Sequence, residues 1–151
     1  MKKIFTLFMM AGLLSACHIA SEEPQPKEDE TSYEAYGLLT IPSSGFTKEN
    51  LRTKVILVNN ELLDIYMFDV KFASMMPVTI DMVISGVGYT KQGNDIHFYG
   101  DSIIPTAGNK PYDKYIVTDL QGIITADSLC LTNNYGTTPS VYAGALNKKD
   151  K

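Results

Sequence analysis

One short stretch of the chain places a histidine among carboxylates. Asp95, His97, Tyr99 and Asp101 alternate with apolar residues, and residues two apart in an extended chain point to the same side. Such a cluster could bind a metal ion or transfer a proton. The same alternation is typical of the solvated side of an amphipathic strand, and one histidine without a nearby cysteine or glutamate makes a poor transition-metal site. We therefore expect neither a metal ion nor a cofactor here.

Other residue types used in catalysis occur without the partners that they need. Ser43-Ser44-Gly45 and Asp127-Ser128 lack the histidine and the strained elbow of a serine nucleophile. Gly86, Gly88 and Gly93 are not followed by a helical pattern, so they suit a hairpin or a bulge better than a phosphate-binding loop. The sequence therefore predicts a protein that is not an enzyme.

Among these residues, Cys17 has the flanking sequence that indicates a role most clearly. Lys2 and Lys3 precede an apolar run over residues 4–14, and small residues follow it. This order of charge, apolar core and small residues is typical of a secretory signal. The run is shorter than the roughly 20 residues that cross a bilayer as a helix. We therefore predict export, with cleavage between Ala16 and Cys17.

Leu14, Ser15, Ala16 and Cys17 resemble the lipobox of bacterial lipoproteins. The resemblance implies that Cys17 becomes the new N-terminus and carries a diacylglycerol thioether and an acylated amine, with chains of the palmitate type. Each buried methylene contributes about 0.8 kcal/mol, so several chains together anchor a protein stably to a membrane. The alternative is an ordinary secretory signal, cleaved near Ala16 or Cys17, that leaves the thiol unmodified.

Residues 17–32 read as a disordered acidic tether, because they combine charges and prolines with almost no large apolar residue. Removal of residues 1–16 leaves 11 basic against 17 acidic residues, a net charge of −6, which argues against a nucleic-acid partner. Ser21-Glu22-Glu23 loosely resembles the surface-export signal of lipoproteins from the Bacteroidales. His18, directly after the cysteine, fits delivery to the outer membrane.

Residues 33–151 suit a single domain with one core. Short apolar-polar alternations separated by turn residues predict about eight strands, and no segment has a convincing helical period. The expected strands are 33–41, 51–58, 62–72, 78–85, 95–101, 114–125, 128–133 and 140–146. Asn59-Asn60 is expected to adopt left-handed conformations in a hairpin, residues 86–93 to form a glycine-rich turn, and residues 105–111 to form a loop. Such a meander favours a closed barrel, with a β-sandwich as the alternative.

Several sulfur-containing residues are expected to serve packing. Cys130 lies between Leu129 and Leu131 without an adjacent basic residue, so we interpret it as a buried or half-buried apolar residue. Lipidation of Cys17 would leave it without a disulfide partner. The methionines of the domain, Met67, Met75, Met76 and Met82, are expected to fill gaps in the core.

The domain is similar to the calycin-like β-barrel lipoproteins of the Bacteroidales, which are related to lipocalins. The residues that carry this resemblance are Phe72, Met76-Pro77-Val78, Ile80, Leu120, Gly122, Asp127, Leu129, Leu131, Val141, Tyr142 and Gly144. It implies an eight-stranded barrel whose interior could hold one small ligand, and it carries no catalytic residues to this chain.

These inferences favour a non-enzymatic lipoprotein of the outer membrane or cell surface, anchored at Cys17, whose barrel binds a small ligand or a partner protein. A second hypothesis is a structural or accessory subunit with a filled barrel that docks on a surface complex. The third is a fimbria-like subunit, in which cleavage at Arg52, the chain's one arginine, would release the first strand.

Overall fold

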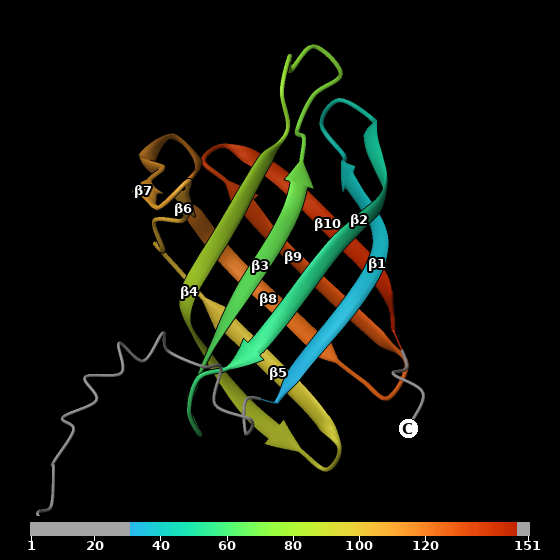
Figure 1. Ribbon diagram of the computed structural model, residues 1–151, viewed down its shortest axis with the longest axis vertical. Coiled ribbons are helices and arrows are strands. Elements are labelled where there is room, and N and C mark those ends of the chain that lie inside the picture. The colour runs from blue at the N-terminus through green and yellow to red at the C-terminus, as the bar shows by residue number, and fades with distance from the viewer. Residues whose placement is uncertain (1–30, 148–151) are drawn as a thin grey trace, which may run out of the picture.

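The computed structural model describes residues 31–147, which form an almost entirely β structure (Figure 1). The signal, Ala16 and Cys17, and most of the acidic segment lie outside the described residues. The elements are β1 (Ser32–Ile41), β2 (Phe46–Leu57), β3 (Leu62–Val70), β4 (Ile80–Gln92), β5 (Asp95–Gly100), β6 (Thr106–Ala107), β7 (Lys110–Pro111), the 3₁₀ turn η1 (Asp113–Tyr115), β8 (Val117–Ile124), β9 (Ser128–Tyr135) and β10 (Thr138–Leu146).

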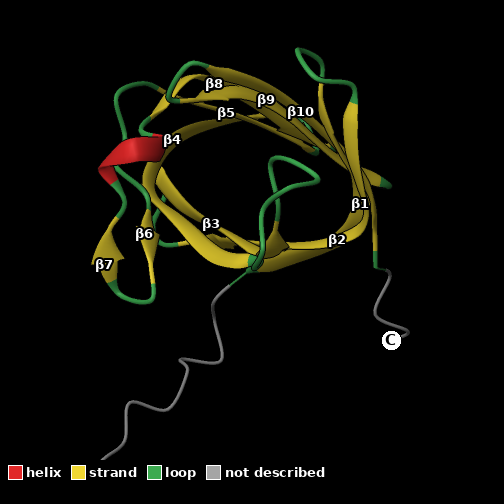
Figure 2. Cartoon of the chain, turned by 90° about the horizontal axis from the view of Figure 1, so that it is seen from above, coloured by secondary structure: helices red, strands yellow, loops and turns green. Residues whose placement is uncertain are grey.

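Eight of the strands close into a barrel. Going round the ring, the order is β1, β2, β3, β4, β5, β8, β9 and β10, and β10 pairs with β1 to complete it. All of these pairings are antiparallel, and the short β6–β7 hairpin is attached to the edge of β4. Figure 2 shows the closed ring from above. The predicted small all-β barrel is therefore confirmed, and the alternative β-sandwich is wrong.

Alternation along each strand separates the core from the outer surface. In β9, Leu129 and Leu131 are fully buried, whereas Cys130 between them faces outward and is half-buried. In β5, Ile96 and Phe98 point inward and Tyr99 is exposed. Most inward positions carry apolar side chains because they are shielded from water on every side of the ring, and Thr53, Asn133 and Ser140 are the buried polar residues of the described chain. The period-two pattern of the sequence therefore translates directly into the barrel core.

The glycine-rich segment 86–93 is not the turn that the sequence predicts. β4 continues through it to Gln92, and only Gly93 and Asn94 form the turn into β5. Gly86 has φ of +73° and sits at an irregularity in the β3–β4 register, where its N–H donates to the Asp64 carboxylate at 2.9 Å. Glycine tolerates this backbone conformation within a strand, so the segment forms a bulge instead of a turn.

The start of β4 also differs from the expectation. Val78 was expected inside a half-buried strand, but pairing begins at Ile80, and Val78 is 67% exposed in the connection 71–79. Met75 is 91% exposed in the same connection, so its expected role in the core is wrong. Met67 and Met82 are fully buried, as predicted. Pro77 cannot donate a ladder hydrogen bond, so pairing cannot run through it, and the structure delays the start by a further two residues beyond the predicted one, to Ile80.

Three smaller expectations need correction. The turn after β2 uses the Asn59 side chain, which accepts hydrogen bonds from the N–H groups of Glu61 and Leu62 at 2.8 Å each, and neither Asn59 nor Asn60 has a positive φ. An Asx-type turn therefore replaces the expected left-handed one. Residues 105–111 include the β6–β7 hairpin, and β8 begins only at Val117 because the 3₁₀ turn η1 precedes it.

Both ends of the described chain lie at one end of the barrel, called here the terminal end. The start of β1 runs beside the end of β10, with Ala35 opposite Leu146. The connection 71–79 lies at the opposite, distal end (Figure 1). The described chain therefore begins, at Thr31, at the end opposite this connection.

Candidate functional site

Large side chains fill the barrel interior. Tyr142 and Tyr135 are almost completely buried. The Tyr135 hydroxyl donates to Met67 Sδ on β3, the strand opposite β9 in the ring, at 3.0 Å, and the Tyr142 hydroxyl donates to the Leu51 carbonyl oxygen on β2, two strands away from β10, at 3.1 Å. Burial raises the pKa of both tyrosines, because the apolar surroundings disfavour the phenolate. The space that a lipocalin-like barrel would offer a ligand is here crossed by the hydrogen bond of Tyr135 to Met67 and narrowed by the buried Tyr142 ring.

Glycines make this filling possible. The Phe98 ring lies on Gly122 of the neighbouring strand, and the Tyr142 ring lies along its own strand over Gly144. A Cβ atom at either glycine would overlap the aromatic ring. At these two positions the absence of a side chain on glycine makes room for a large ring on the inner face of the barrel.

Aromatic side chains also cover the distal end. Phe72, in the connection 71–79, is buried and stacks on Tyr115 and Tyr135 with ring-centre distances of 4.8 and 4.6 Å. Tyr112 adds a third contact to Tyr115 at 4.9 Å. Tilted ring pairs at these distances are favourable beyond their buried area. The connection 71–79 therefore contributes a side chain to the core, while Met75 at its tip faces solvent.

The most distinctive outer surface runs across β1, β10, β9, β8 and β5. Leu38, Ala143, Cys130, Ile123 and His97 stand opposite one another in consecutive strand pairs and form one row. Residues directly opposite in antiparallel strands share a face. Leu38 is 39% exposed. We call this surface, together with Tyr36, Val141 and Thr132 beside the row, the uncharged wall.

The uncharged wall is hollowed. A groove of about 430 Å³ lies along β8, β9 and β10, lined among others by His97, Ile123, Cys130, Thr132, Val141 and Ala143. Small side chains on β9 and β10 form its floor, and Tyr36 and Leu38, which are 45% and 39% exposed, rise beside it on β1. A ridge and a groove of apolar character therefore lie side by side.

The other side of the barrel has a different character. β2 carries Lys48, Glu49, Arg52 and Lys54, whereas the 19 residues from 128 to 146, which include all of β9 and β10, contain no charged residue and no histidine. A solvated sheet face normally carries charged side chains, and their depletion is typical of the centre of a protein interface. The charge-free run 128–146 is the sequence signal that indicates this wall, and the motif-based sequence analysis above does not use it.

The alternation around His97 forms the amphipathic strand that the sequence favours, with Ile96 and Phe98 buried and Tyr99 exposed. His97 lies at the margin of the uncharged wall, opposite Ile123 on one side and Thr90 on the other. The carboxylate of Asp101 instead accepts hydrogen bonds from the Asp119 N–H and the Ser102 hydroxyl, which lower its pKa. Within residues 31–147, no three histidine, cysteine or acidic side chains are grouped so that they could hold a metal ion.

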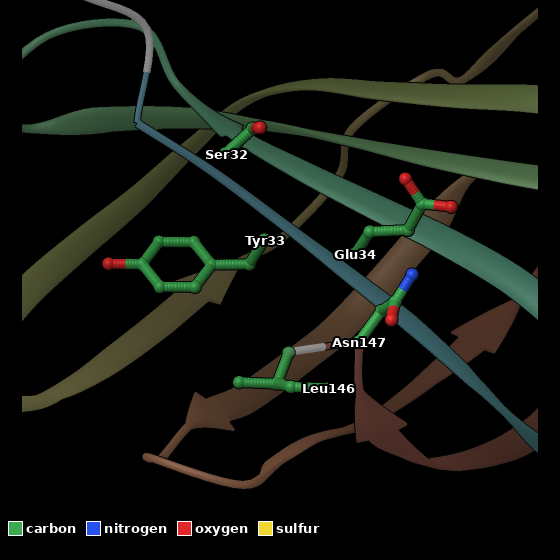
Figure 3. Close-up of a pocket in the computed structure, with 5 residues that line it drawn as sticks. All are labelled: Ser32, Tyr33, Glu34, Leu146 and Asn147. Atoms are coloured by element: carbon green, nitrogen blue, oxygen red, sulfur yellow. The ribbon is translucent and has the colours of Figure 1, made fainter. Parts of the chain in front are cut away.

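A second cavity, of about 210 Å³, lies at the terminal end (Figure 3). Its lining consists of Ser32, Tyr33, Glu34, Leu146 and Asn147. Figure 3 shows the Tyr33 ring and the Glu34 carboxylate leaving β1 on opposite sides. Arg52 Nε donates to Glu34 Oε1 at 2.8 Å, and the Tyr36 hydroxyl donates to the same oxygen at 2.9 Å. These bonds lower the pKa of Glu34 and keep it ionised, so it is suited to structure more than to proton transfer.

Arg52 itself lies in the middle of β2, paired opposite Tyr36. Its side chain combines the ion pair to Glu34 with a position 4.5 Å over the Phe68 ring. β1 is hydrogen-bonded on both sides, to β2 and β10, so a cut at Arg52 would divide β2 as well as release β1.

Comparison with known proteins adds no relative. No protein-family model matches the chain, and no curated protein and no solved structure shows significant similarity to it. In the described part of the chain, residues 31–147, no helix is long and apolar enough to span a membrane. The structural class of the protein follows from its strand pairing alone: it is a closed eight-stranded antiparallel barrel.

Proposed function

We propose that the chain is a lipid-anchored, non-enzymatic binding module of the outer membrane or cell surface, and that it works by docking a protein on the uncharged wall. The observation that carries this proposal is a contrast. The interior positions are occupied by large side chains such as Tyr135 and Tyr142, whereas a contiguous apolar and charge-free surface is left on the outside. Contiguous exposed apolar patches on a folded protein often mark interaction sites.

The orientation of the barrel supports the same role. The segment with Cys17 enters at the terminal end, so an anchor there leaves the side wall and the distal end free to meet a partner. The residues between Cys17 and Ser32 reach at most about 50 Å when fully extended. A module on such a tether can turn its wall toward a neighbour in the same membrane.

The anchor gives the first prediction. We expect Cys17→Ser in the full chain to abolish membrane association in an exporting host, because the acyl chains are the sole strong anchor proposed. The measurement is the partition of the protein between detergent-rich and aqueous phases, together with the mass of the N-terminal peptide. Cys130→Ser is the matched control and should stay with the membrane. A Cys17→Ser protein that remains membrane-bound would contradict the anchor.

Docking gives the second prediction. A photo-crosslinking amino acid placed at Val141, in the centre of the wall, should give a discrete protein adduct in intact cells, whereas the same group at exposed Ser85 on β4 should not. The adduct is identified by mass spectrometry of its peptides. Equal adduct patterns at the two positions, or none at Val141, would overturn docking on this wall.

The small-ligand hypothesis is tested separately. Native mass spectrometry of the exported protein should give the mass of the processed chain with its covalent acyl groups and no further component, because the interior is filled. A reproducible extra mass that is lost on denaturation would favour a ligand, for which the cavity beside Tyr33 would be the first place to look.

A further inference from the structure

We propose that Met75 is a site of reversible oxidation, at which a peroxide converts the thioether into a sulfoxide while the barrel stays folded. This inference goes beyond the proposed function, because Met75 lies in the connection 71–79 at the distal end and takes no part in the uncharged wall. Three observations carry it: the exposure of Met75, the protection of the other three methionines within residues 31–147, and the aromatic stack that holds the connection.

Exposure selects Met75. Its side chain is 91% exposed, the largest value among the exposed large apolar residues of the described chain. Met67 and Met82 are 0% and 1% exposed and belong to the core. A peroxide in solution therefore meets the sulfur of Met75 directly, whereas it reaches Met67 or Met82 only when the barrel opens.

Hydrogen bonds protect two of the other sulfurs further. Met76 is partly buried against the core, and its Sδ accepts a hydrogen bond from the Phe72 N–H at 3.1 Å. Met67 Sδ accepts one from the Tyr135 hydroxyl at 3.0 Å. A thioether is a weak acceptor with few lone pairs, and a lone pair in a hydrogen bond is less available to attack an oxygen atom. Both bonds therefore slow oxidation at these two sulfurs relative to Met75.

The reaction is an oxygen transfer. A lone pair of the Met75 sulfur attacks one oxygen of hydrogen peroxide, an S–O bond forms as the O–O bond breaks, and the second oxygen leaves as water after proton transfer. The sulfur loses two electrons and the peroxide gains them. Thiol-dependent reductases return the sulfoxide to the thioether, the oxygen leaves as water, and two thiols become a disulfide.

The packing of the connection explains why the fold tolerates the added oxygen. Phe72 holds the connection, because its buried ring stacks on Tyr115 and Tyr135. Met75 is at the tip, so the oxygen of its sulfoxide lies in water and not in the core. The tip also exposes Val78, by 67%. Oxidation therefore converts an exposed apolar tip into a polar one and leaves the aromatic stack in place.

The test treats the full chain, purified in peroxide-free detergent from an exporting host, with hydrogen peroxide. A Cys130→Ser background removes the thiol of the described chain, and peptide mapping by mass spectrometry follows one added oxygen at each methionine. We expect Met75 to react at least about tenfold faster than Met67 and Met82, whose oxidation requires opening of the barrel. It should also react faster than Met76. Equal rates at Met75 and at any of these three would overturn the proposal.

Matched variants assign the fast reaction. Met75→Leu should abolish the fast uptake of oxygen, whereas Met76→Leu should leave it unchanged. Both substitutions keep an apolar side chain of similar volume, and thermal unfolding verifies that each variant is folded. Fast uptake that persists in Met75→Leu would overturn the assignment.

Two further measurements separate a tolerated modification from damage. Protein oxidised only at Met75 should unfold within about 2 °C of the untreated protein, because changes at exposed positions cost little stability. The two epimer-specific methionine sulfoxide reductases, supplied together with dithiothreitol, should remove the oxygen from the folded protein. A larger fall in the unfolding temperature, or an oxygen that is removed only after denaturation, would contradict the proposal. The adduct at Val141 tests the docking function independently of all these results.

Discussion

Tyr142→Ala is expected to destabilise the barrel by about 4 kcal/mol, which is the range for removing a fully buried aromatic side chain. The ring lies against bare backbone at Gly144, and its hydroxyl donates to the Leu51 carbonyl oxygen at 3.1 Å. Alanine would leave a cavity beside Gly144 and remove the hydrogen bond to the Leu51 carbonyl oxygen. Urea unfolding followed by circular dichroism measures this loss.

Tyr142→Phe separates the two contributions. It keeps the ring and removes only the hydrogen bond, so we expect a loss of about 1 kcal/mol. A loss for Tyr142→Ala as small as that for Tyr142→Phe would contradict the filled interior, because it would mean that the ring occupies no space that packing requires. Such a result would favour an open pocket.

The titration of Tyr142 adds a pH signature. Burial raises its pKa above the ordinary value of 10.0, so the native state retains a proton that the unfolded state loses. This contribution to stability is complete below about pH 10 and is lost as the pH rises from there toward the native pKa. Tyr142→Phe should therefore flatten the alkaline decline that the wild-type protein shows. An unchanged decline would place the responsible groups elsewhere, for example at Tyr135.

Gly37→Ala is expected to destabilise the barrel by about 3 kcal/mol, at the upper end of what overpacking usually costs. A Cβ atom at Gly37 would overlap the backbone of Ala143 and Gly144 on β10. These backbone atoms cannot turn away as a side chain can, so β1 and β10 must separate at the pairing that closes the ring. The gain from a stiffer unfolded chain, about 0.4–1 kcal/mol, is too small to offset this.

Gly88→Ala is the matched control for Gly37→Ala. Its new Cβ would lie 3.3 Å from the ring of Tyr99, which is an exposed side chain that can move. We expect a loss of less than about 1 kcal/mol, measured in the same urea titration. Equal effects of the two substitutions would mean that the close approach of β1 and β10 does not limit stability.

The sequence alone was sufficient to predict the barrel class and most of its strands. Strands can be predicted because their signal is local. Period-two alternation such as Leu129-Cys130-Leu131 assigns one face of a strand to the core whatever the neighbouring strand is. Side-chain character added to this: methionine as a gap-filler placed Met67 and Met82 in the core, and the apolar flanks of Cys130 predicted a buried or half-buried thiol, which is half-buried. The prediction of lipidation at Cys17 also depends on a local motif, and it awaits its experiment.

The tertiary structure alone decided what the barrel contains and what it exposes. Whether a ring of inward residues leaves a pocket depends on side-chain volumes summed across strands far apart in sequence, as in the bond between Tyr142 and Leu51. The bulge at Gly86 depends on the register with β3, and the late start of β4 leaves Val78 in solvent. The uncharged wall likewise exists only once closure of the ring sets Leu38 beside Ala143 and Cys130 beside Ile123, because a surface is a property of neighbouring strands and each strand by itself shows only alternation.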